Sequence, residues 1–164
     1  MEENITKLEK IEYLKNGHNK LQGLINSLDT KQLTELKVLK DWTIKDVLSH
    51  LSAWNWEELK SVDQLLNGER PWWWEIPEEE FNEQEVLKRR NISVEEVIKE
   101  WKDSFNQLME KIETLTDQEW ETGRSEKWPR GTPFTVKSMF IYEYYGLDHE
   151  GGHAKQIEEF FKNN

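Results

Sequence analysis

The chain has 164 residues, a formal net charge of −11, 34% charged and 35% hydrophobic residues, nine tryptophans and no cysteine. Length and aromatic content predict one folded domain over residues 1–164 and argue against disorder. The acidic charge disfavours nucleic acid as a partner, and the lack of a long apolar run or a secretory signal predicts a cytoplasmic protein with no membrane partner. Without cysteine, any thiol chemistry would need a soluble thiol cofactor.

Apolar residues at helical spacing predict a first helix over residues 8–28, with His18 on the apolar stripe. A second helix is predicted to start at the capping box of Thr43 and Asp46, where each residue bonds the backbone of the other, and to end at residues 67–68, an Asn-Gly pair. His50 would lie in its second turn.

The next segment, residues 69–91, is a long connection rich in tryptophan and proline, with a short helix predicted near residues 83–89. Trp72, Trp73 and Trp74 in this connection are candidates for the wall of a substrate pocket, and core packing is at least as good an explanation for two of them.

A third helix is predicted from the capping box of Ser93 and Glu96 to Leu115, because its apolar residues follow the helical period closely. After a loop containing glycine and proline, a last helix is predicted to begin at Thr135 and to run without interruption through Phe160.

These elements predict an all-α fold, a four-helix bundle in which each half is a helix, a loop and a capped helix. A weak internal repeat supports the two halves, since residues 28–33 resemble 115–120 and residues 42–45 resemble 134–137. No strand is predicted, because alternating runs of β-branched residues are missing.

Three histidines are the candidate metal ligands: His50 in the second helix, and His149 and His153 four residues apart on the last one. Side chains at this spacing share one helix face, about 6 Å apart along the axis. Three neutral imidazoles could hold a divalent ion and leave a position open for water or substrate. The alternatives are an exposed polar pair and a hydrogen-bonded core histidine. Rings more than about 8 Å apart would exclude a shared ion.

Residues near the candidate ligands carry further predictions. Asp46 lies four residues before His50 and Trp54 four residues after it, and Tyr145 lies four residues before His149. Asp46 could therefore orient a ligand, and the two aromatic residues could line a substrate pocket. A helix cap and core packing are the favoured alternatives. Gly151 and Gly152 cost about 1 kcal/mol each inside a helix, so they either kink it or admit a close neighbour.

Residues 42–54, 81–82, 89–97 and 149–157 together resemble segments of the DinB/YfiT-like family of metal-binding four-helix bundles. The resemblance implies that His50, His149 and His153 hold the metal, usually nickel or zinc. Some family members are similar to transferases or isomerases that use bacillithiol-type or mycothiol-type thiols, and others are called hydrolases. The Gly-Gly pair between the last two histidines departs from the family pattern.

Three functions remain open from the sequence. The first is a metal-dependent enzyme that activates water or a low-molecular-weight thiol for hydrolysis of, or S-transfer to, a small electrophile. The second is a non-catalytic protein that binds a damaging small molecule, related to the colibactin self-resistance bundles, which generally lack the histidine triad. The third is a bundle with structural histidines. Such bundles are often homodimers, and the catalytic residues are not predicted.

Overall fold

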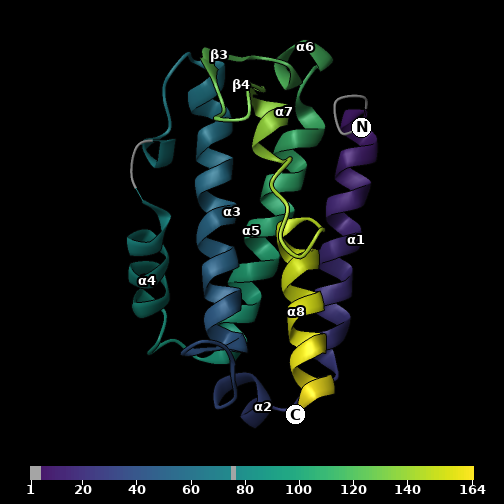
Figure 1. Cartoon of the computed structure of the whole chain (residues 1–164), viewed down its shortest axis with the longest axis vertical. Coiled ribbons are helices and arrows are strands. Elements are labelled where there is room, and N and C mark those ends of the chain that lie inside the picture. Colours follow the sequence, from purple (N-terminus) through teal and green to yellow (C-terminus); the bar gives the residue numbers. More distant parts are fainter. Residues whose placement is uncertain (1–4, 75–76) are drawn as a thin grey trace.

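The computed structural model describes residues 5–74 and 77–164. Four long helices run side by side, α1 (Lys7–Asn26), α3 (Ile44–Leu66), α5 (Val94–Thr114) and α8 (His149–Asn163) (Figure 1). Helix α3 packs mainly on α5, and α1 packs mainly on α8. The predicted all-α class and four-helix bundle are therefore confirmed. Among the described residues, no helix is both long and apolar enough to cross a membrane.

The long helices begin where side chains satisfy the free backbone N–H groups of the first turn. Thr43 and Asp46 form the predicted capping box of α3, and Ser93 and Glu96 form that of α5. The apolar stripes then meet in the interior, where Trp101 of α5 is completely buried. Burial of each large apolar side chain contributes about 1.5–3 kcal/mol to folding, which makes these stripes the main support of the bundle.

The tryptophan-rich connection contains more helix than the sequence predicted. The 3₁₀ helix η2 (Trp72–Trp74) comes first, and α4 (Glu78–Lys88) follows and packs against α3. Residues 75–76 of the predicted connection lie outside the described residues. Arg89 fixes the end of α4, since its guanidinium pairs with Glu85 at 2.7 Å and with Glu100 of α5 at 2.9 Å. Helix α4 therefore stands as an extra element beside the bundle (Figure 1).

The prediction that strands are absent is wrong, because two short antiparallel hairpins occur. Strands β1 (Lys37–Leu39) and β2 (Trp42–Thr43) pair before α3, and β3 (Gly123–Lys127) and β4 (Pro133–Thr135) pair before α7. Such short strands carry too few residues for an alternating pattern to stand out. A short helix precedes each hairpin, α2 (Thr30–Thr34) and α6 (Asp117–Trp120), so the weak sequence repeat corresponds to a repeated helix, hairpin and capped helix.

The prediction of one uninterrupted last helix is also wrong. Helix α7 (Val136–Met139) ends after one turn, residues 140–148 are irregular, and α8 then begins at His149. Tyr145 has a φ of 56° and Gly146 a φ of 73°, both in the left-handed region that a regular helix excludes. Asp148 then caps α8 by accepting a hydrogen bond from the backbone N–H of Gly151 at 3.2 Å. His149 is consequently the first residue of its helix and not a residue midway along it.

Candidate metal centre

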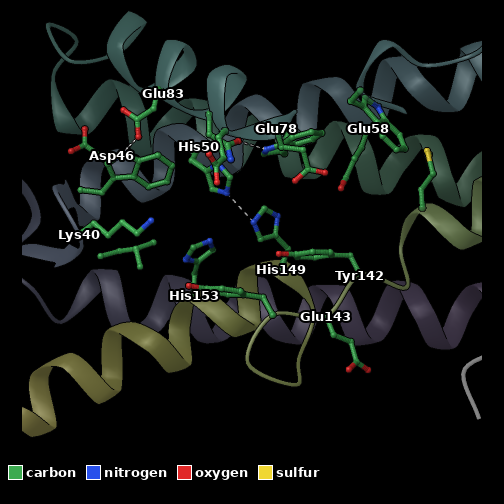
Figure 2. A pocket seen from close by; sticks show the side chains of 18 of the residues that line it. Lys40, Asp46, His50, Glu58, Glu78, Glu83, Tyr142, Glu143, His149 and His153 are labelled. Atoms are coloured by element: carbon green, nitrogen blue, oxygen red, sulfur yellow. Dashed lines mark hydrogen bonds between the residues drawn. The ribbon is translucent and has the colours of Figure 1, made fainter. Parts of the chain in front are cut away.

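The rings of His50, His149 and His153 converge between α3 and the start of α8 (Figure 2). One ligand atom from each lies within 4.8 Å of the other two, and the ring centroids are 4.9 to 5.5 Å apart. The Nε2 atoms of His50 and His149 are 3.0 Å apart. These separations are well inside the distance that would exclude a shared ion, and this group of side chains could hold a metal ion.

The irregular segment before α8 reaches the triad because of two glycines. A Cβ atom at Gly152 would lie 2.2 Å from the backbone oxygen of Tyr144, and one at Gly151 would lie 2.5 Å from the Asp148 carboxylate. Of the two roles considered for the Gly-Gly pair, the close neighbour is the one found, and α8 continues through both glycines. The pair therefore lets residues 140–148 fold back onto the helix that carries two of the three histidines.

This folded-back segment places aromatic rings on the triad. The ring of Tyr142 lies 5.5 Å from that of His149, and the ring of Tyr144 lies 4.6 Å from that of His153. Tyr145, the candidate from the sequence, does not line the cavity and is 45% exposed. The spacing argument assumed a helix here. In an irregular, extended segment, residues two apart share a side, and that pattern could have identified Tyr142 and Tyr144.

Asp46 is buried and lies along the same cavity, but its contacts are those of a helix cap. Its carboxylate accepts from the backbone N–H of Thr43 at 3.0 Å, and its backbone N–H donates to the Thr43 hydroxyl. The Nδ1 atom of His50 is buried and has no hydrogen-bond partner among the described residues, so Asp46 does not orient that ring through a hydrogen bond. The cap alternative accounts for this residue.

The triad opens into a cavity of about 1780 Å³ between α3, α4, both hairpins and residues 138–144. Trp54, Trp73 and Trp74 line it, as the sequence suggested, and Trp128 of the second hairpin joins them by stacking on Trp73 at 5.9 Å. Trp72 lies outside, packed on Trp54 at 6.4 Å. Indole N–H groups are tied to the protein, for example that of Trp54 to Asn82 at 2.7 Å. The aromatic wall is therefore held rigidly.

His18 contacts a different group of residues, behind the triad. Its Nδ1 atom lies 2.6 Å from the carboxylate of Glu150, and its ring stacks on Phe105 with centroids 3.9 Å apart. The same carboxylate accepts a hydrogen bond from the Trp101 indole at 3.0 Å. Because Glu150 follows His149 directly, this buried network fixes the first turn of α8 from the core side.

Burial keeps the three imidazoles neutral. It lowers the pKa of His50 to about 3 and that of His153 to about 4. Burial and the two neighbouring imidazoles also lower the pKa of His149 well below its usual value. A neutral imidazole offers a lone pair to a metal ion without first losing a proton, so proton competition at these nitrogens is weak at neutral pH.

These lowered pKa values predict a pH-dependent stability in the metal-free protein. Below about pH 6.5 an unfolded histidine takes up a proton that folded His50 refuses, so His50 destabilises the fold increasingly as the pH falls. Relative to wild type, His50→Gln should therefore gain about 2 kcal/mol of stability between about pH 7 and pH 5. Urea unfolding at both values measures this. An unchanged difference between the two proteins would contradict a depressed pKa.

The comparisons with known proteins agree with this architecture. A solved structure of an uncharacterised protein from Escherichia coli UTI89 is similar over 97% of this chain and 94% of that one, with a TM-score of 0.75 and 16% identity, which shows the shared fold. No curated protein matches the sequence. The family model of the DinB superfamily matches residues 13–157, which include all three triad histidines and most of the chain. The chain belongs to the DinB superfamily.

Proposed function

We propose that the protein is a metal-dependent enzyme that uses water or a low-molecular-weight thiol as the nucleophile toward a small electrophile. The observation that carries this proposal is the convergence of His50, His149 and His153 on one point at the floor of a large cavity. Three side-chain ligands are the number found in catalytic sites that keep a position open, whereas structural zinc sites usually have four.

The residues present fit a divalent ion such as zinc or nickel. All three ligands are neutral imidazoles, and the buried Nδ1 atom of His153 has no hydrogen-bond partner among the described residues. A bound ion would lower the pKa of water or of a thiol and so supply a nucleophile at neutral pH. The chain has no cysteine of its own, so the thiol would be a soluble cofactor.

The protein's own residues would bind and orient the electrophile. Trp54, Trp73, Trp74 and Trp128 offer apolar surface along one wall of the cavity, and their packing reduces the entropy lost when a substrate is held there. Tyr142 also lines the cavity, with its ring edge-on to that of His149. An apolar or aromatic electrophile would therefore be held beside the three imidazoles.

The second candidate is a non-catalytic protein that binds a damaging small molecule. The size and aromatic wall of the cavity favour it, because neither feature requires chemistry at the histidines. The two candidates differ in their need for the triad. Binding alone should survive the loss of metal, whereas turnover should not.

The test is incubation of zinc-loaded or nickel-loaded protein with bacillithiol or cysteine and a chlorobimane dye, measured by thioether fluorescence. We expect turnover that chelation removes and metal restores. Dye conjugation at the uncatalysed rate, together with metal-independent binding of aromatic ligands, would favour the binding protein. Stoichiometric metal should be found after purification without a histidine tag, and its absence after loading would contradict the metal-dependent enzyme.

A further inference from the structure

Glu58 is a carboxylic acid that faces the triad cavity without a partner. It lies on α3 two turns after His50, is half-buried, and lines the large cavity together with all three histidines. Within residues 5–74 and 77–164, its side chain forms no hydrogen bond and no ion pair. Burial of a carboxylate without a cation or a hydrogen-bond donor beside it disfavours the charged form.

A second cavity touches the same residue. A chamber of about 40 Å³ lies behind His149 and is lined by Asn55, Glu58, Asp148 and Glu150, among others. This volume is sufficient for water, and its walls carry the polar groups that water requires. Glu58 lines both cavities and therefore lies between the reaction space and a small chamber with a mixed apolar and polar lining.

The charged and titratable groups around Glu58 favour its neutral form. Glu150 of α8 approaches from behind, but its own carboxylate is engaged by His18, the Trp101 indole and the Asn55 amide. Burial and this neighbouring negative charge raise the pKa of Glu58 to about 8. The other titratable groups near it on the shared walls include His149, Asp148, Tyr142 and Glu78. The large cavity also has cationic side chains, and within the described residues none of them forms an ion pair with Glu58: Lys37, Lys40, Arg90, Lys127 and Arg130.

Other side chains in the cavity are poorer proton donors. The three imidazoles are neutral, and metal binding would occupy them. Burial raises the pKa of the Tyr142 hydroxyl further above its already high value. The Asp148 carboxylate is engaged in capping α8. Burial also raises the pKa of Glu78, but Glu78 is exposed to solvent. Among these groups, Glu58 is the half-buried acid that faces the triad without a partner within the described residues.

We propose that Glu58 is a catalytic residue, the general acid that donates a proton to the leaving group of the electrophile. This inference rests on the proposed function. A thiol that has released its proton to solvent forms a carbon–sulfur bond, the bond from that carbon to the leaving atom breaks with both electrons, and the leaving atom takes the Glu58 proton. Solvent then reprotonates the carboxylate. The donor matters most when the leaving group is strongly basic.

The test compares two electrophiles with the metal-loaded protein and bacillithiol. An epoxide leaves an alkoxide that needs a proton, whereas chlorobimane releases chloride, which needs none. Glu58→Gln should lower kcat with the epoxide by about 10²-fold or more and change the rate with chlorobimane by less than about 3-fold. The matched control is Glu57→Gln, since Glu57 is the adjacent carboxylate on α3 and lines neither cavity. It should behave as wild type with both electrophiles.

Infrared difference spectroscopy provides a readout independent of activity. Titrating the metal-free protein from about pH 6 to pH 10 should remove a protonated-carboxyl band in wild type and Glu57→Gln, and that band should be missing in Glu58→Gln. Four results would each overturn the role of Glu58. The rates with both electrophiles could fall equally in Glu58→Gln, or all three proteins could have equal rates. All three proteins could also show the same carboxyl band, or the wild type could turn over the dye and not the epoxide. No turnover of either electrophile by wild type would remove the proposed function and the Glu58 proposal together.

Discussion

Replacing His149 with alanine is expected to abolish stoichiometric binding of zinc or nickel. His149 is the central member of the triad, because its Nε2 atom lies 3.0 Å from that of His50 and its ring is within 5.1 Å of that of His153. Two remaining imidazoles on different helices would bind a divalent ion far more weakly, and affinity should fall at least about 10²-fold, by analogy with the 10–100-fold cost of losing even an outer partner of a ligand. Isothermal titration calorimetry and elemental analysis measure this.

The fold should tolerate this substitution, since His149 faces the cavity and is only partly buried. The helical circular-dichroism signal should remain at the wild-type level. A suitable control is Glu143→Ala, because Glu143 lies on the same irregular segment and its side chain points away from the triad (Figure 2). That variant should bind metal as wild type does. Full metal occupancy in His149→Ala would show that the ion is held elsewhere.

Gly152→Ala should cause a clear loss of stability. The new Cβ would lie 2.2 Å from the Tyr144 oxygen, a backbone atom that moves only if the segment or α8 moves with it. Overpacking of this kind costs about 1–3 kcal/mol. For a chain of this size, that cost corresponds to a fall in melting temperature of about 3–10 °C. Because Tyr144 also packs on His153, metal affinity should fall as well.

Gly23→Ala is the matched control for this substitution. Gly23 is also inside a helix, but a Cβ there would meet nothing within 4 Å. Alanine should therefore stabilise α1 by up to about 1 kcal/mol through its better helix propensity. Thermal unfolding of both variants under identical conditions separates propensity from the steric effect. Equal stabilisation by the two substitutions would rule out the close approach of Tyr144 to α8 in solution.

Local sequence signals were sufficient to predict the helices whose apolar residues form a regular stripe along one face. The capping boxes at Thr43 and Ser93 located the starts of α3 and α5, because a cap depends only on residues three apart. The histidine set could likewise be proposed from spacing and family resemblance. The DinB superfamily match confirms the resemblance, and the geometry shows that the three rings meet.

Other features depended on contacts between distant segments, which no local pattern encodes. The break before α8 is stabilised by the approach of Tyr144 to Gly152 and by the Asp148 cap. The sequence prediction continued the helix through this break and therefore placed Tyr145 on the cavity side, which it does not line. Glu58 went unnoticed because a glutamate on a helix is unremarkable in sequence. The environment of Glu58 forms only in the folded protein, where Glu150 of α8 lies behind its carboxyl group and the cavity lies in front of it. The sequence by itself thus determined the long helices α1, α3 and α5 and the candidate ligands, through short-range hydrogen bonding and periodicity. The tertiary structure alone decided which side chains surround those ligands, because burial and charge proximity arise only when the helices pack.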